Sequence, residues 1–283
     1  MQQIVWITGG NDGIGLATAQ VLLERGLFVL ISGRNMPKLK AAVATLKHRT
    51  GKDTIDWLLC DMADHNSIRA AVKVFQDCYD QLDILINNAG IFSSELALSK
   101  NGVEMQFAVN YLGHFLLTDL LLPHLSLSPT ARIINVASIA HYKGKIDYQN
   151  LKGEKGHQNY EGMEAYSQSK LANVLFTREL ARRYPDITSN CLHPGVVRTR
   201  IADKGASCFY TMLWMLYKPF MRPTRCGART SIYLALSPEV NGVKGRYFDQ
   251  YQSCRKPSSI ACDKAAAKKL WEWSEAEVKV TVE

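Results

Sequence analysis

Tyr166 and Lys170 are the first residues whose types and spacing could support chemistry. They stand four residues apart within Glu164–Phe176, a segment whose apolar residues recur at helical spacing. Residues four apart lie on the same side of a helix, so this segment brings a phenol beside an ammonium group. A phenol ordinarily titrates at a pKa of about 10, and a neighbouring positive charge favours its ionised form. The pair is therefore either an ordinary polar contact on a solvated face or a phenol that exchanges its proton with a substrate.

A glycine-rich turn follows the first apolar run of the chain. The sequence TGGNDGIG lies between a predicted strand and a predicted helix, a context in which glycines let the backbone approach a pyrophosphate closely. Its spacing, G-x-x-x-G-x-G, differs from the common G-x-G-x-x-G fingerprint, but its position favours the same role. The alternative is a set of glycines that only closes a tight turn. The predicted cofactor contacts in this turn are Thr8, Gly9, Gly10, Asn11, Asp12, Gly13, Ile14 and Gly15.

The second predicted strand bears on the choice of cofactor. A site that prefers NAD usually has an acid about 20 residues beyond the turn, hydrogen-bonded to the ribose 2′-hydroxyl. In this chain Gly33 occupies that position and Arg34 follows it. A guanidinium can bind the 2′-phosphate of NADP with two hydrogen bonds, whereas an acid would repel it. We therefore expect NADP(H) rather than NAD, the alternative being that Arg34 is an ordinary solvated residue at a helix entry.

These residues need a scaffold, and apolar runs that alternate with helical patterns supply one. Several runs are almost entirely apolar, as in a parallel sheet covered by helices on both faces. No repeat or linker divides residues 1–283, so we expect a single doubly wound α/β domain of the Rossmann type with a parallel sheet of about seven strands. The predicted strands are Ile4–Thr8, Phe28–Ser32, Ile55–Cys60, Ile84–Asn87, Arg132–Ala137, Thr188–Leu192 and Gly245–Phe248. The predicted helices lie near Gly13–Arg25, Lys38–His48, Ser67–Tyr79, Gly102–His124, Glu164–Arg183 and Cys226–Ala235.

Composition narrows the classes of partner. The chain is 47% hydrophobic and carries a formal net charge of +8, which favours an anionic partner such as a phosphorylated cofactor or an acidic membrane surface. Its basic residues are dispersed without interleaved aromatics, so we expect no nucleic-acid binding. The seven scattered cysteines favour a reducing compartment, and the histidines lack metal-ligand spacing, so no metal is expected. We see no signal peptide and no spanning apolar run, and we expect a cytoplasmic or peripherally membrane-associated protein.

Taken together, the motifs resemble those of the short-chain dehydrogenase/reductase family. Besides TGGNDGIG, the chain has NNAG at Asn87–Gly90, Asn110 within VNYLGHF, Ser138 after IINVA, YSQSK from Tyr166 and HPGVVRT from His193, in the family's order. The resemblance covers roughly residues 4–250. It implies a Rossmann fold and an oxidoreductase that transfers hydride between a nicotinamide cofactor and a carbonyl or alcohol.

The resemblance implies roles for four catalytic residues. Tyr166 would donate a proton to the substrate oxygen in reduction and remove one in oxidation. Lys170 would favour the phenolate of Tyr166 and would also hold the nicotinamide ribose. Ser138 would hydrogen-bond the substrate oxygen and stabilise the developing charge, although a serine at a strand end also caps helices. Asn110 would hold a water in a proton relay behind the lysine, or else it is a satisfied core asparagine at a helix kink.

The resemblance also extends the predicted cofactor site. Asp61 would reach the adenine, and its neighbour Met62 departs mildly from the leucine that is usual there. Val197 would contact the carboxamide through its backbone, and Thr199 would bond the diphosphate. The remaining cofactor positions implied by the family motifs are Asn88, Ala89, Gly90, Pro194 and Gly195.

The region around Tyr166 resembles the retinol-dehydrogenase-like branch of the family, on HYKGKIDYQNLKGEK before it and SKLANVLFTRELARR after it. That branch implies a small lipophilic substrate, such as a retinoid or another lipophilic aldehyde, ketone or alcohol, mostly with NADP. Steroids and fatty aldehydes are alternatives within the same chemistry. A non-catalytic NADP(H)-binding sensor or scaffold is an alternative of a different class.

Two segments near the C-terminus complete the prediction. Residues 200–225 include the apolar run FYTMLWMLY, which we interpret as a substrate lid. The alternatives are a core helix or a surface that rests on a membrane, with Lys218 and its basic neighbours facing lipid phosphates. Residues 263–276 predict an amphipathic helix in which Trp271 and Trp273 cannot share a face, so one of them would be free to contact a second subunit of a homodimer.

Overall fold

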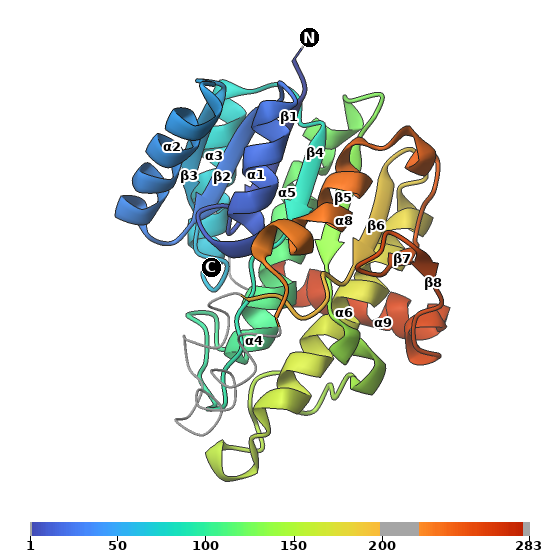
Figure 1. The fold of residues 1–283 in the computed structure, drawn as a ribbon. Helices are drawn as coiled ribbons and strands as arrows, with labels where there is room; N and C mark the ends of the chain where they lie inside the picture. The colour runs from blue at the N-terminus through green and yellow to red at the C-terminus, as the bar shows by residue number, and fades with distance from the viewer. Residues whose placement is uncertain (1, 199–220, 280–283) are drawn as a thin grey trace.

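The computed structural model describes residues 2–198 and 221–279, whose strands form one sheet between helices (Figure 1). The strand order is β3-β2-β1-β4-β5-β6-β7-β8, and every neighbouring pair is parallel except the antiparallel pair β7 and β8. The order reverses between β1 and β4, where a doubly wound sheet leaves a crevice at the carboxyl ends of its strands. The strands are β1 Ile4–Thr8, β2 Phe28–Gly33, β3 Ile55–Leu59, β4 Ile84–Asn87, β5 Arg132–Val136, β6 Thr188–Leu192, β7 Tyr247–Phe248 and β8 Cys254–Arg255.

Different helices cover the two faces of the sheet because side chains alternate along each strand. Val5 and Ile7 of β1 are buried in the core that includes side chains of α1, α2 and α8. Trp6, between them, is buried in the opposite core with side chains of α3, α5 and α6. These helices are α1 Gly13–Glu24, α2 Met36–Thr50, α3 His65–Cys78, α5 Gly113–Ser126, α6 Gly162–Arg183 and α8 Thr224–Leu236.

The predicted elements are present with small shifts of their ends, and two differences are larger. β8 adds an antiparallel edge strand, so the described sheet has eight strands where the sequence indicated about seven. Its two residues are too few to produce a periodic pattern. The helix predicted over Gly102–His124 begins instead as the short α4, Met105–Phe107, and continues as a π-helical segment over Ala108–Leu112 before α5.

The π-helical segment lies where α5 passes close to the loop after β3. A Cβ atom at Gly113 would collide with the carbonyl oxygen of Met62, so only glycine allows this approach. Single π-turns within α-helices are rare and occur frequently at functional sites. Asn110, at the centre of this turn, is fully buried.

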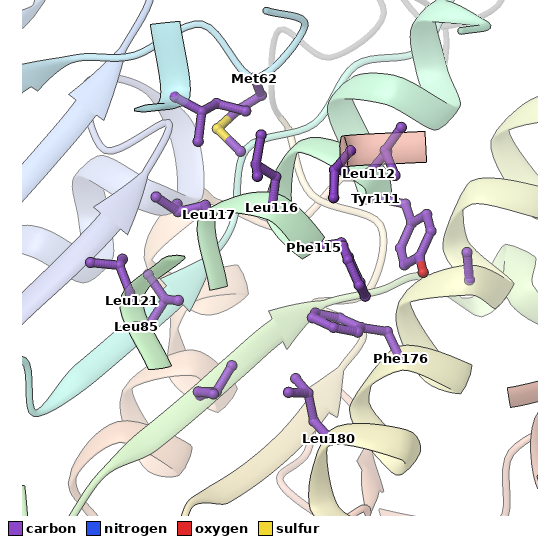
Figure 2. Close-up of a cluster of buried hydrophobic side chains, with 14 of the residues drawn as sticks. Met62, Leu85, Tyr111, Leu112, Phe115, Leu116, Leu117, Leu121, Phe176 and Leu180 are labelled. Carbon is purple, nitrogen blue, oxygen red and sulfur yellow. The ribbon is translucent and has the colours of Figure 1, made fainter. Parts of the chain in front are cut away.

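The larger core lies between the sheet, α5 and α6 (Figure 2). The close-up shows Phe115 and Leu116 of α5 among side chains from the strands and from α6. The ring centroids of Phe115 and Phe176 lie 5.5 Å apart, a distance typical of a favourable aromatic pair. This core fixes α6, and therefore Tyr166 and Lys170, against the sheet.

The C-terminal helix α9, Lys264–Lys279, covers α5 and α6 from outside. Trp271 is 2% exposed, and its ring lies 5.0 Å from that of Phe115 and 4.6 Å from the guanidinium carbon of Arg183. Trp273 contacts Phe107 edge to face at 5.8 Å. Both tryptophans therefore contact their own chain: Trp271 is covered by it, whereas Trp273 is only partly buried, and a contact of one of them with a second subunit stays a prediction. Burial of a tryptophan of this kind stabilises a fold by about 3–5 kcal/mol relative to alanine.

Two expectations concern membranes and the lid. Within residues 2–198 and 221–279, no helix has the length and apolar character needed to cross a bilayer. The predicted lid, residues 200–225, lies outside the described residues except for its last five positions. Of these, Arg222 pairs with Val197 in an isolated parallel bridge.

Candidate functional site

A cavity of about 760 Å³ opens at the carboxyl ends of the central strands. Its wall includes residues from the turn after β1, the end of β2, and the loops after β3, β4, β5 and β6. A cavity at this edge is the ligand site expected of a doubly wound sheet. The predicted site residues that line it are Gly9, Asn11, Asp12, Gly13, Ile14, Arg34, Asp61, Met62, Asn88, Ala89, Gly90, Ser138, Tyr166, Lys170, Pro194, Gly195 and Val197.

The glycine-rich turn forms one wall of the cavity. Gly9 and Gly13 have φ angles of 64° and 58°, a left-handed conformation that glycine adopts without strain. Asp12 caps α1, because its carboxylate accepts a hydrogen bond from the backbone N–H of Gly13 at 2.8 Å. The turn therefore presents the N-terminus of α1 to the cavity, an arrangement that favours an anionic ligand.

Three residues of the same turn are buried and do not line the cavity, and their predicted contacts with the cofactor stay a prediction. Thr8 is fully buried, and its hydroxyl accepts hydrogen bonds from the loop after β4. A Cβ at Gly10 would lie 2.6 Å from Cγ2 of Ile31, and one at Gly15 would lie 2.5 Å from the carbonyl oxygen of Gly9. These two glycines therefore allow close packing within the turn, as the alternative of glycines that close a tight turn implies.

The end of β2 places basic side chains at the cavity. Arg34 is exposed and lines the wall, and Lys38, in the first turn of α2, lines it nearby. Within residues 2–198 and 221–279, neither side chain forms an ion pair with a carboxylate. A Cβ at Gly33 would lie 2.7 Å from Oδ1 of Asn11, so a larger residue at this position would require the Asn11 side chain to move. Lys38 was missed by the sequence analysis; its signal is a basic residue one turn into the helix after β2.

The loop after β4 is held at two points. The Thr8 hydroxyl accepts hydrogen bonds from the backbone N–H groups of Asn88 and Ala89 at 2.9 and 3.0 Å. The Asn110 side chain accepts from the N–H of Ile91 at 2.8 Å and donates to its carbonyl oxygen at 3.0 Å. Asn110 also donates to the Ser169 hydroxyl at 3.0 Å, so both of its amide N–H groups and its amide oxygen have partners, as in a satisfied core asparagine. Its part in holding a water stays a prediction.

The other walls come from the loops after β3 and β6. The Asp61 carboxylate accepts from the N–H of Ala63 at 3.0 Å, which fixes the loop that carries Met62. Gly195 has a φ of 80°, and its N–H donates to Nδ1 of His193 at 3.2 Å. Val197 is buried and marks the end of this wall. Thr199 lies outside the described residues.

Ser138, Tyr166 and Lys170 meet at the opposite end of the cavity from Arg34. The Ser138 side chain caps a short 3-10 helix, Ile139–Lys143, by accepting from the N–H of Ala140 at 3.2 Å, so it is a helix cap as well as a cavity residue. Its hydroxyl also forms a hydrogen bond with Tyr166. The Lys170 ammonium donates to the carbonyl oxygen of Val136 at 3.0 Å and lies 5.6 Å from the centroid of the Tyr166 ring.

The electrostatics of this trio differ from our expectation in one respect. We expected the Lys170 charge to lower the pKa of Tyr166; instead, removal of water by the surrounding protein raises that pKa, and the hydrogen bond with Ser138 opposes the rise. Burial lowers the pKa of Lys170 to about 8. The phenol is thus protonated at neutral pH, which suits a group that donates a proton.

Apolar side chains surround this trio, and the sequence analysis did not identify them. Phe92 contacts the Tyr166 ring edge to face, with centroids 5.9 Å apart. Ile139, Met163 and Val196 line the cavity while remaining 60%, 47% and 61% exposed. Large apolar side chains that are exposed beside polar reactive groups are a feature of sites for apolar ligands. They lie on irregular loops and at a helix start, where no periodic pattern marks them.

The cavity fits a dinucleotide in its shape and its chemistry. It runs from basic side chains at the end of β2, past backbone N–H groups at the start of α1, to the Ser138–Tyr166–Lys170 trio. A Cβ at Gly9 would lie 3.1 Å from Cα of Ala89, so the turn and the loop after β4 approach this closely because Gly9 has no side chain. Along the cavity, basic side chains are therefore followed by backbone N–H groups and then by the hydroxyl groups of Ser138 and Tyr166.

Known proteins share this arrangement. The family model for short chain dehydrogenase matches residues 3–207. Retinol dehydrogenase 14 of Mus musculus is 40% identical over 296 residues, which cover 98% of this chain and 86% of that protein. Retinol dehydrogenase 12 of Homo sapiens is 40% identical over 273 residues, which cover 95% and 84%. A solved structure of a protein from Mycobacterium paratuberculosis aligns with a TM-score of 0.78 and 34% identity, covering 98% of this chain and 94% of that one.

The fold, the order of the motifs and these similarities agree. A match of this identity across nearly the whole chain extends well beyond the glycine-rich turn that many nucleotide-binding proteins share. The chain belongs to the short-chain dehydrogenase/reductase family of oxidoreductases and is similar to its retinol dehydrogenases.

Proposed function

We propose that this protein is an NADP(H)-dependent oxidoreductase that transfers hydride between the nicotinamide and a lipophilic carbonyl or alcohol, with Tyr166 as the proton donor or acceptor. The observation that carries the proposal is the meeting of Ser138, Tyr166 and Lys170 in one cavity, beside exposed apolar side chains. A protein that only binds the cofactor has no need for a proton donor there, so the trio favours an enzyme over a sensor or scaffold. The retinol dehydrogenases to which the chain is similar favour a substrate of this class.

Arg34 and Lys38 support NADP(H) over NAD(H). Both line the cavity at the end of β2, where the family binds the adenosine ribose, and neither pairs with an acid in the part of the chain that the structure describes. A ribose 2′-phosphate supplies the negative charge that such side chains bind strongly. Asn11, Asp12 and Ile14 of the glycine-rich turn would then lie along the diphosphate.

The protein's own contribution to reduction is a set of hydrogen bonds and one proton. The bound cofactor supplies the hydride. Ser138 donates a hydrogen bond to the substrate carbonyl and stabilises the negative charge that develops on its oxygen. Tyr166, protonated at neutral pH, donates its proton to that oxygen. The Lys170 ammonium stabilises the phenolate that remains, and Asn110 would hold a water behind it.

The exposed apolar rim also favours contact with a lipid surface. Ile139, Met163 and Val196 surround the opening beside the reactive trio, so a lipophilic substrate can pass into the cavity without crossing bulk water. The net charge of +8 favours a membrane that contains acidic lipids. Sedimentation with phosphatidylserine-containing vesicles tests this contact, and equal recovery with and without vesicles would contradict it.

The function is tested by following NADPH absorbance with purified protein and a panel of retinal, long-chain aldehydes, steroids and small ketones. We expect oxidation of NADPH with lipophilic carbonyls and much slower oxidation of NADH. Silence across the panel, together with measurable NADPH binding, would favour the sensor. Turnover of small ketones at the same rate would contradict the lipophilic substrate but leave the chemistry intact.

A further inference from the structure

His114, on the first turn of α5, takes no part in the chemistry above, yet it lies at the centre of the hydrogen bonds behind the cavity wall. Its side chain is 1% exposed. Nε2 lies 2.8 Å from the Thr8 hydroxyl, and Nδ1 lies 3.2 Å from the backbone carbonyl oxygen of Asn110. The two residues that clamp the loop after β4 therefore both contact one imidazole ring, Thr8 through its hydroxyl and Asn110 through its backbone carbonyl.

The surrounding hydrogen bonds determine which ring nitrogen carries the proton. The Thr8 hydroxyl oxygen already accepts from the N–H groups of Asn88 and Ala89, which occupy both of its lone pairs. Its own proton has two acceptors within reach, His114 Nε2 at 2.8 Å and the carbonyl oxygen of Ile86 at 3.4 Å. The shorter contact makes Nε2 the acceptor. Nδ1 then carries the proton and donates it to the Asn110 carbonyl, which can only accept.

The ring is neutral in this arrangement. Burial, helped by the nearby Lys170 charge and opposed by the hydrogen bond to Asn110, lowers the pKa of His114 to about 3. A neutral ring is the state that can accept at one nitrogen and donate at the other. The chain of hydrogen bonds thus runs in one direction, from the loop N–H groups through Thr8 and His114 to Asn110.

We propose that His114 is a positioning residue that holds the loop Asn88–Ile91 in register with Lys170 by joining its two clamps. Thr8 holds the start of this loop, and Asn110 holds its end. Between the clamps lies Gly90, at which a Cβ would be 3.3 Å from Oδ1 of Asn110 and 3.6 Å from the Lys170 ammonium nitrogen. The loop and Lys170 border the same cavity, so a shift of the loop changes the fit of the cofactor and the surroundings of the ammonium group. This inference rests on the proposed cofactor site.

The test compares three variants of one residue with a control variant. His114→Leu removes both hydrogen bonds, His114→Gln keeps an acceptor that reaches the Thr8 hydroxyl, and His114→Asn keeps a donor near the Asn110 carbonyl. The control is Tyr111→Phe, which removes a buried hydrogen bond of 2.6 Å to Ser274 on the side that faces α9. All four are compared in melting temperature, in NADPH dissociation constant from fluorescence titration, and in kcat and KM.

We expect His114→Leu to raise the NADPH dissociation constant about tenfold and to lower kcat by a similar factor, as the loss of buried hydrogen bonds would. His114→Gln should recover most of the affinity, and His114→Asn less. Tyr111→Phe should lower the melting temperature comparably while leaving the dissociation constant within about twofold. Affinities in His114→Leu that match the wild type, or that fall only as far as in Tyr111→Phe, would overturn the proposal. Because the titration needs no substrate, it is decisive even if the wild type reduces none of the carbonyls tested.

Discussion

At the β1–β2–β4 end of the cavity the wall includes several glycines, whereas at the β5–β6 end it includes exposed apolar side chains. Gly9 and Gly13 at the first end have a left-handed backbone, and Gly9 also packs closely on the loop after β4. Ile139 and Met163 at the second end are exposed at the starts of a short 3-10 helix and of α6. Backbone walls require particular residue types at fixed spacing, while side-chain walls can be built from many apolar residues. The glycine-rich end of the cavity therefore carries a recognisable sequence motif, and the apolar end carries the specificity for the substrate.

The largest effect on turnover should come from a substitution in the reactive trio of Ser138, Tyr166 and Lys170. Tyr166→Phe removes the proton donor and keeps the ring that packs on Phe92. We expect turnover to fall by about 10³-fold, since general acid catalysis contributes about 10²–10⁴-fold, with NADPH affinity unchanged within about threefold. Steady-state kinetics and fluorescence titration measure the two quantities. Turnover near that of the wild type would show that another group supplies the proton.

The glycine-rich end can be separated from its charged side chains. Arg34→Ala should weaken NADPH about 10- to 100-fold, as expected for a lost charge-assisted hydrogen bond, and should leave NADH almost unchanged. The control is Lys40→Ala, because Lys40 lies in the same helix region but over the Trp57 ring at 5.7 Å, away from the cavity. The dissociation constants of NADPH and NADH are measured for both variants and for the wild type. Equal losses for NADPH and NADH would assign Arg34 a structural role.

The pH dependence of reduction should reflect Lys170. Its pKa is lowered to about 8, and that of Tyr166 is raised, so the ammonium loses its proton first as the pH increases. We expect kcat/KM to be level below pH 8 and to fall about tenfold per pH unit above it. Lys170→Arg should be slower but level over the same range, because a guanidinium stays charged. A wild-type profile that remains level to pH 10 would show that the lysine charge is not required.

The smallest effect should come from the apolar end. Met163→Ala removes part of the rim, and we expect KM for a long-chain aldehyde to rise about fivefold, with little change for a small ketone. Met36→Ala is the matched control, because Met36 is a similarly exposed methionine that does not line the cavity. KM for the long-chain aldehyde and for the small ketone is measured with both variants. An equal rise for both substrates would place Met163 in catalysis and not in specificity.

The same contrast explains what could be predicted from the sequence. The strands β1 and β4 have the predicted bounds because buried parallel strands are mostly apolar, and β6 has them too although its sequence, TSNCL, is largely polar. The π-helical turn at Asn110 could not be predicted, since it depends on hydrogen bonds to the distant Ile91 and Ser169. The rise in the pKa of Tyr166 depends on how much water the folded protein excludes, which no local spacing records.

Some predicted cofactor contacts have, in the structure, contacts with neighbouring protein groups. Thr8, Gly10 and Gly15 belong to the glycine-rich motif, but their contacts are with Ala89, Ile31 and the Gly9 backbone and not with the cavity. A motif read from sequence does not separate residues that touch a ligand from residues that let the wall form. His114 is the reverse case, because its importance comes only from the two groups that the fold brings to its ring.

The position of α9 in the chain has a consequence for how the protein is made. The helix contributes Trp271 to the surface formed by Phe115 and Phe176, and it is synthesised after every strand of the described sheet. Until Lys264–Lys279 have been synthesised and have folded onto α5 and α6, the apolar faces of these two helices lack the cover that Trp271 provides. Folding in the order of synthesis therefore includes a stage at which these aromatic rings are less protected from water than in the complete fold.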